Sequence, residues 1–120
     1  MGVNRRAIGK KYEEIALALL EEQGYLILEK NYNNQYGEID IIAQEQETLV
    51  FVEVKYRSSG SYGDALEAVD RRKQKRICRS ALYYCSKKHR NLEIPCRFDV
   101  IAIYGEHKMI HIKNAFEYSA

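Results

Sequence analysis

Residues 37–57, GEIDIIAQEQETLVFVEVKYR, constrain the fold of this chain more than any other segment. They contain two apolar runs, 37–44 and 48–56, which are rich in strand-forming residues and are separated by a short polar stretch. A connection this short joins neighbouring antiparallel strands in a hairpin. The segment therefore predicts two adjacent strands of one sheet, with substantial burial on both faces.

A few charged side chains interrupt this apolar hairpin. Side chains alternate between the two faces of a strand, so Glu53 and Lys55 share one face, while Glu38 and Asp40 share a face opposite Ile39 and Ile41. A four-residue loop at 45–48 places Asp40 directly opposite Glu53, with Cβ atoms about 5 Å apart. We therefore predict that two carboxylates and one amine converge here, with Glu38 at the rim.

Two interpretations of this charged group are open. Two carboxylates about 5 Å apart repel by roughly 3 kcal/mol at an effective dielectric constant of about 20. In the first interpretation, Lys55 offsets the excess charge in a partly buried, structural ion pair with Glu53 or Asp40. In the second, a divalent cation offsets it, because oxygen-rich sites without His or Cys suit Mg²⁺ or Mn²⁺.

The remaining periodicity predicts helices on both sides of the hairpin and further strands. Amphipathic helices are expected over residues 5–23, ended by Gly24, and over 70–89, with an extra turn at 65–69. Further strands are expected at 25–32, 97–104 and, more weakly, 109–113, and loops at 57–64 and 91–96. This order predicts one α/β domain over residues 1–120, in which helices pack on a mixed sheet.

The helix at 70–89 has an apolar inner face and a basic outer stripe. Lys73 and Gln74 lie on the line of the inner face, one turn before it, and we expect them to project toward the carboxylates. The inner face consists of Ile77, Cys78, Ala81, Leu82 and Cys85. The outer stripe is Arg72, Arg76, Arg79 and Tyr83, to which Arg71, Lys75, Lys87, Lys88 and Arg90 add charge. On a chain with a net charge of +2, such a local patch fits contacts to nucleic-acid phosphates, and the alternative is a solvated helix face.

Composition argues against several other classes of protein. The three cysteines, Cys78, Cys85 and Cys96, lack CxxC spacing, so we expect reduced and mostly buried thiols rather than disulfides or a zinc site. No apolar run approaches the ~20 residues of a membrane span, and the N-terminal residues lack the apolar segment of a signal peptide. We therefore expect a soluble, cytoplasmic protein without a membrane partner.

Asp40, followed across the hairpin by Glu53-Val54-Lys55, resembles the D…(E/D)xK core of the PD-(D/E)XK, or restriction-endonuclease-like, nucleases. More closely, the chain resembles the YraN-like family of small uncharacterised bacterial proteins, which are related to Holliday-junction resolvases. The segments that carry this resemblance are Gly9 with Glu13 and Ala16, 37–40, 51–55, 73–74, 97–100 and 114–116. Two departures are Tyr12, where that family often has Gly, and Ile39, where a proline usually precedes the aspartate.

The resemblance implies a restriction-endonuclease-like fold and metal-dependent hydrolysis of DNA phosphodiester bonds, with branched or damaged DNA in repair or recombination as the candidate substrate. It implies that Asp40 and Glu53 bind Mg²⁺ or Mn²⁺, with the Val54 carbonyl as a candidate third ligand and Glu13 as an outer one. Lys55 would orient or deprotonate the attacking water or neutralise charge on the phosphate, and Gln74 is a further catalytic candidate. The expected nucleic-acid contacts are Arg72, Lys73, Arg76 and Arg79.

Two other functions remain open on the sequence alone. One is a non-catalytic nucleic-acid-binding module that keeps the carboxylates, and the other is a protein-interaction domain whose basic face meets an acidic partner. Metal-dependent cleavage separates a nuclease from both, and salt-sensitive DNA binding separates the two from each other. DNA is the expected partner, and a homodimer is among the oligomeric states that the sequence leaves open.

Overall fold

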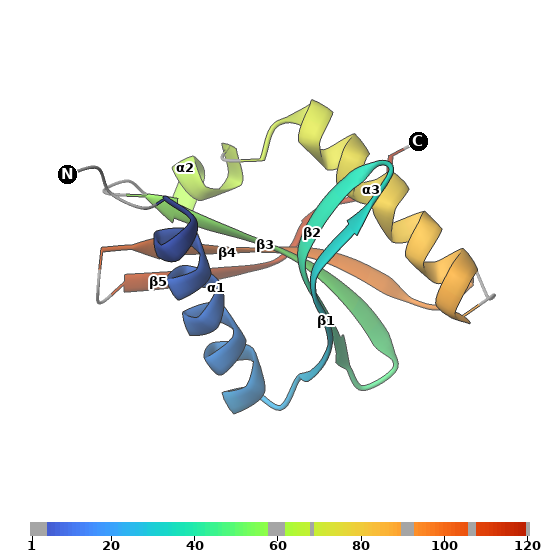
Figure 1. The fold of residues 1–120 in the computed structure, drawn as a ribbon, viewed down its shortest axis with the longest axis horizontal. Coiled ribbons are helices and arrows are strands. Elements are labelled where there is room, and N and C mark those ends of the chain that lie inside the picture. Colours follow the sequence, from blue (N-terminus) through green and yellow to red (C-terminus); the bar gives the residue numbers. More distant parts are fainter. Residues whose placement is uncertain (1–4, 58–61, 68, 90–92, 106–107, 120) are drawn as a thin grey trace.

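The chain folds around a mixed five-stranded sheet (Figure 1). This computed structural model describes residues 5–57, 62–67, 69–89, 93–105 and 108–119. The strands lie in the sheet in chain order: β1 (Leu26–Asn34), β2 (Gly37–Glu45), β3 (Thr48–Arg57), β4 (Cys96–Tyr104) and β5 (Lys108–Phe116). Neighbouring strands are antiparallel except β3 and β4, which are parallel because a helical crossover connects them.

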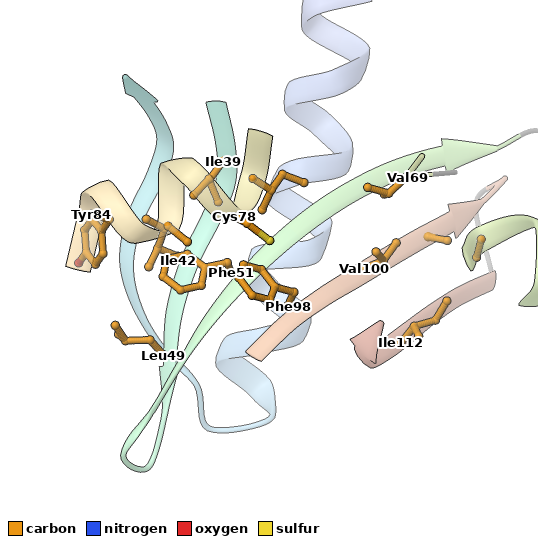
Figure 2. Packing of buried hydrophobic residues seen from close by; sticks show 14 of the residues in the cluster. Ile39, Ile42, Leu49, Phe51, Val69, Cys78, Tyr84, Phe98, Val100 and Ile112 are labelled. Atoms are coloured by element: carbon orange, nitrogen blue, oxygen red, sulfur yellow. The ribbon is translucent and has the colours of Figure 1, made fainter. Parts of the chain in front are cut away.

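Helices cover both faces of this sheet. One face packs beneath α1 (Arg5–Glu22), and the other packs beneath α2 (Tyr62–Glu67) and α3 (Arg71–Tyr84), which continues into a π-helical turn at Cys85–His89. The core beneath α3 contains Ile42, Phe51, Cys78, Tyr84, Phe98 and Val100 (Figure 2). The core beneath α1 contains Ala16, Leu20, Ile41, Val50, Val52 and Ile101. Because both faces are covered, the central strands are almost continuously apolar.

The structure confirms the elements expected from the sequence, with shifted boundaries. The extra turn expected at 65–69 is the short helix α2, and the weak fifth strand is longer than expected because backbone pairing with β4 tolerates its polar side chains. α1 ends at Glu22, and Gly24 terminates it as predicted: its φ of +90° lets the N–H of Tyr25 reach the carbonyl of Leu20 at 2.9 Å. Residues 58–61 and 91–92 of the expected loops lie outside the described residues.

α3 is oriented slightly differently from the prediction. It begins after Asp70, whose Oδ1 accepts the N–H of Lys73 at 2.8 Å and caps the helix. The expected inner face is wrong at Leu82, which is 42% exposed, whereas Ser80 and Tyr84 are buried. The large ring of Tyr84 meets Phe51 edge to face, and burying that ring on the sheet turns Leu82 toward solvent.

Two further predictions concern the state of the cysteines and the absence of a membrane-spanning segment. All three cysteines are free, but Cys96 is exposed, because it begins β4 at the rim of the sheet, while Cys78 and Cys85 are buried. Within the described parts of the chain, no helix is both long and apolar enough to cross a membrane.

A buried ionic network joins β4 to its neighbours on the face beneath α1. The fully buried Asp99 accepts hydrogen bonds from Arg97 Nε at 2.9 Å and from the N–H of Asn114 at 3.0 Å, and it lies 2.8 Å from His111 Nε2. Arg97 also binds Glu45 at 2.9 Å. Although burial opposes ionisation, the bonds from His111 and Arg97 lower the pKa of Asp99. The Asp99 carboxylate therefore has hydrogen-bond partners on both β4 and β5, whereas the buried Nδ1 of His111 has none among the described residues.

Candidate functional site

β2 and β3 separate where the charged residues lie. Their pairing runs from Glu45 opposite Thr48 to Ile41 opposite Val52, and the same register, continued by one pair, sets Asp40 opposite Glu53. At that point a side chain takes the place of the backbone ladder, because Asp40 Oδ2 accepts the N–H of Val54 at 2.8 Å. Asp40 is therefore fixed between the two strands by the backbone of the second one.

The side chains of β2 do not alternate regularly around Asp40. Ile41 packs beneath α1, whereas Ile39 and Ile42 both pack in the core beneath α3. The prediction that Ile39 and Ile41 share one face is therefore wrong. The hydrogen bond from Val54 draws the Asp40 carboxylate toward the neighbouring strand, and Ile39 lies on the side that regular alternation assigns to Asp40.

Asp40 and Glu53 line one hollow of about 330 Å³ at the start of α3, which we call the carboxylate hollow. Its other lining residues are Gly37, Glu38, Asp70, Arg72, Lys73, Arg76 and Ile77. Glu53 is only 4% exposed, so its charge needs compensation from neighbouring groups. The structure thus brings the two predicted carboxylates to one place, with Glu38 beside them.

Two lysines surround Glu53. Lys73 Nζ of α3 lies 2.7 Å from Glu53 Oε1, and Lys55 Nζ lies 3.6 Å from the same oxygen. Burial and the neighbouring Lys73 lower the pKa of Lys55. Burial also opposes the charge of Lys73, but its hydrogen bonds to Glu53 and Lys55 and the charges of Glu53 and Asp40 together raise its pKa. The sequence predicted that Lys73 projects toward the carboxylates and contacts nucleic acid. It did not predict that Lys73, rather than Lys55, is the nearer partner of Glu53.

The surroundings of Asp40 disfavour its negative charge. Burial and the charge of Glu53 raise the pKa of Asp40 to about 8, although the N–H of Val54 favours its ionised form. The folded protein therefore opposes full ionisation of this carboxyl group near neutral pH. Carboxyl groups whose pKa is raised in this way occur preferentially at functional sites.

Glu13 of α1 approaches Asp40 from the other side of the sheet. The two residues line a second, smaller hollow of about 90 Å³ together with Lys10, Lys30 and Asn31. Burial and the charges of Glu38 and Glu53 raise the pKa of Glu13 above its ordinary value, although a hydrogen bond with Asn31 opposes this shift. Asp40 is thus the residue that the two hollows share.

Gln74 lies apart from the carboxylates. Its Nε2 donates to the carbonyl of Val69 at 2.9 Å, and it lines a separate hollow with Arg71 and Lys75. Its expected direction toward the carboxylates is therefore wrong, because one further position along α3 turns the side chain away from Glu53 and a backbone acceptor holds its amide. The catalytic role expected of Gln74 stays a prediction that this placement does not favour.

The basic stripe extends from the carboxylate hollow along α3. Arg72 and Arg76 line that hollow, and Arg79 lies farther along the helix in another one. All three arginines are exposed, as are Arg71, Lys75, Lys87 and Lys88. Arg90 lies outside the described residues. The stripe therefore offers accessible positive charge that begins beside Asp40 and Glu53.

Asp40 and Glu53 are the residues of the carboxylate hollow that could hold a divalent cation. Across the described residues, no three His, Cys, Asp or Glu side chains form a group that could hold a metal ion. Mg²⁺, however, is commonly bound by one or two carboxylates together with substrate phosphates. Asp40 and Glu53 would supply those carboxylates, and a cation between them would favour the ionised form of Asp40, which burial and the charge of Glu53 disfavour.

Comparison with other proteins places the chain in a family. Residues 12–103 match the family described as "Uncharacterised protein family UPF0102", and this span contains Glu13, Asp40, Glu53, Lys55 and Lys73. A UPF0102 protein of Fusobacterium nucleatum is 44% identical over 93% of this chain and 92% of its own length. A UPF0102 protein of Geobacter metallireducens is 45% identical over 98% of both chains. The chain therefore belongs to the UPF0102 family.

Proposed function

We propose that this chain is a Mg²⁺- or Mn²⁺-dependent endonuclease of restriction-endonuclease-like fold that hydrolyses phosphodiester bonds in DNA. The carboxylate hollow carries this proposal. It combines Asp40 and Glu53, which suit a divalent cation, with Lys73 and Arg76, which suit a phosphate. The amine of Lys55 lies beside this hollow, 3.6 Å from Glu53 Oε1. Phosphoryl transfer depends mainly on such positioned charges. The D…ExK pattern and the order of helices and strands support placement in the PD-(D/E)XK superfamily.

The residues in and beside the carboxylate hollow would have different roles in this reaction. Asp40 and Glu53 would hold the cation, which when bound polarises phosphoryl oxygens and lowers the pKa of a coordinated water. Lys55 has its pKa lowered by burial, so its Nζ can exchange a proton nearer to neutral pH than a surface lysine can. Lys73 and Arg76 place positive charge where a phosphate would carry negative charge.

A non-catalytic nucleic-acid-binding module is the second candidate, and one observation favours it. Lys73 and Lys55 already lie within ion-pair distance of Glu53, at 2.7 and 3.6 Å, and so compensate its charge. A domain that keeps its carboxylates for structure alone would have such pairs. In that case the basic stripe would bind DNA without cutting it.

A cleavage panel separates these candidates. Linear, nicked, flapped and four-way DNA are incubated with the protein in Mg²⁺, in Mn²⁺ and in EDTA. We expect cleavage of at least one substrate with metal, none in EDTA, and none by Glu53→Gln. Glu47→Gln, at an exposed position in the β2–β3 turn, is the matched control and should cleave like wild type.

Each negative result has a defined meaning. DNA binding without cleavage by the wild type in both metals would contradict the nuclease and support the binding module. Absence of DNA binding at low salt would contradict both and leave a protein-interaction domain.

A further inference from the structure

The hollow that Arg79 lines lies on α3 beyond the carboxylate hollow. It has a volume of about 320 Å³ and is lined by Tyr36, Arg79, Leu82, Tyr83 and Ser86. Tyr36 belongs to the turn between β1 and β2, and the other four residues belong to α3 and its π-helical continuation. Figure 1 shows this turn beside α3, so the hollow joins segments that are far apart in the sequence. We call it the tyrosine hollow.

Hydrogen bonds and ring contacts hold the turn in place. Asn34 Oδ1 accepts the N–H of Tyr36 at 2.8 Å, and the hydroxyl of the buried Ser80 donates to the same oxygen at 3.3 Å. The ring of Tyr36 meets the ring of Tyr83 at an edge, with centroids 6.0 Å apart. Tyr36 is nevertheless 39% exposed. The fold therefore fixes an aromatic ring at the surface and leaves a substantial part of it in water.

Positive charge surrounds these rings. Arg79 lines the tyrosine hollow, and Lys87 Nζ lies 5.6 Å from the centroid of Tyr83. Aromatic rings beside guanidinium and ammonium groups are the usual surface on which unstacked nucleobases bind, with the cations on the phosphates. An acidic peptide would use the cations but would gain little from the ring. The chemistry of this hollow therefore favours a nucleotide.

The spacing along α3 connects the two hollows. Lys73 contacts Glu53, and Tyr83 lies ten residues later, which is about 15 Å along a helix. Successive phosphates of one strand advance by about 3.4 Å along a duplex, so the two points lie a few nucleotides apart. Arg76 and Arg79 are exposed between them. One strand can thus follow the arginines from one hollow to the other.

We propose that the tyrosine hollow binds one unpaired nucleobase of a DNA strand whose phosphates follow Arg79 and Arg76 to the carboxylate hollow. A base inside a duplex is covered on both sides by its neighbours, so only an unpaired or extruded base can stack on Tyr36. The inference rests on the proposed function, and it narrows the substrate to DNA with a single-stranded segment. A flapped or gapped substrate has such a segment, and an intact duplex has none.

The test compares single-stranded and duplex DNA of equal length in EDTA, so that no metal-dependent cleavage interferes. Fluorescence anisotropy gives the affinity of wild type, Tyr36→Ala, Tyr36→Phe and the control Tyr118→Ala. Tyr118 is 52% exposed and lines neither the carboxylate hollow nor the tyrosine hollow. We expect Tyr36→Ala to weaken single-strand binding roughly tenfold, since stacking contributes this order of affinity per base. Tyr36→Phe and Tyr118→Ala should bind like wild type, and duplex affinity should not change.

A second readout reports the stacking itself. A 2-aminopurine in the single strand loses fluorescence when it stacks, so one position of the label should be quenched by wild type and by Tyr36→Phe but not by Tyr36→Ala. Equal loss of single-strand and duplex affinity in Tyr36→Ala, or unchanged affinity for both, would overturn the inference and leave the nuclease proposal standing. A wild type that binds neither DNA would overturn both.

Discussion

Asp40 and Asp99 have the same side chain and lie in the same sheet, but their surroundings act on them in opposite directions. Burial and Glu53 raise the pKa of Asp40 to about 8, although the N–H of Val54 and the charge of Lys73 oppose this shift. Burial also acts on Asp99, but the bonds from His111 and Arg97 lower its pKa below the ordinary value. The first aspartate therefore destabilises the fold when it ionises, and the second stabilises it. Replacing each aspartate with asparagine therefore tests which of the two charges stabilises the fold.

Asp40→Asn should stabilise the metal-free protein by about 1 kcal/mol or more near neutral pH, because it keeps the shape of the side chain and removes a group whose ionisation burial and Glu53 disfavour. The unfolded carboxyl ionises near 3.8 and the folded one near 8, so wild type loses stability as pH rises between these values. The advantage of the mutant should therefore grow from pH 4 to pH 8. Urea unfolding of both proteins in EDTA across this range measures it. A mutant that is less stable by about 3 kcal/mol would show that Asp40 compensates a buried lysine instead.

Asp99→Asn should do the reverse, with a loss of about 3 kcal/mol or more at neutral pH, because it leaves the charge of Arg97 without its buried partner. The native pKa of Asp99 is lowered, so its stabilising contribution is present above the unfolded value of 3.8 and disappears as pH falls below it. The difference between the two proteins should therefore shrink in acid. The same unfolding series measures it, and a mutant as stable as wild type at pH 7 would contradict a structural role for this network.

Lys73→Met should tighten binding of Mn²⁺, because the amine of Lys73 lies 2.7 Å from Glu53 Oε1 and competes with a cation for that oxygen. Isothermal titration calorimetry in the absence of DNA measures the dissociation constant. Lys87→Met removes an exposed lysine that does not line the carboxylate hollow and should leave the constant unchanged. Weaker metal binding by Lys73→Met would mean that Lys73 organises the carboxylates rather than competing for them.

Among the helices and strands, α3 contains the exposed arginines of the proposed DNA-binding surface. Replacing Arg72, Arg76 and Arg79 together with Ala should weaken DNA binding and flatten its salt dependence by roughly one unit of log–log slope per lost phosphate contact. Affinities measured at several salt concentrations give the slope. Lys108→Ala, on the edge strand β5, is the control for loss of charge alone. A slope equal to that of wild type would identify the stripe as a solvated helix face.

The hairpin of β2 and β3 could be predicted closely because local rules determine it. A two-residue connection, Gln46-Glu47, fixes the register, and the register brings Asp40 and Glu53 together. The rules fail where tertiary contacts intervene. The irregular side chains around Asp40 follow from its bond to Val54, and the exposed Leu82 follows from packing Tyr84 against Phe51. No local pattern in the sequence contains either contact.

In the whole molecule, the candidate site is assembled from α1, from the β2–β3 hairpin and from α3. The sequence pattern identifies the carboxylates on β2 and β3, and Glu13 on α1 follows them through the family resemblance. The partner of Glu53 and the ring beside Tyr83 depend instead on how α3 crosses the sheet and on where the β1–β2 turn ends. Lys73 and Tyr36 acquire their roles from this packing, which helical and strand periodicity cannot specify.

The proposed function requires that Asp40 and Glu53 together hold a divalent cation. Melting temperatures of wild type and Asp40→Asn, each in EDTA and in excess Mn²⁺, measure this binding, because a ligand that binds the native state stabilises it by mass action. Binding at about 100 times the dissociation constant contributes roughly 2.7 kcal/mol, enough to raise the melting temperature by several degrees. We expect this rise in wild type and its absence in Asp40→Asn. A wild type with the same melting temperature in EDTA and in excess Mn²⁺ would contradict the metal site and the nuclease function proposed from it.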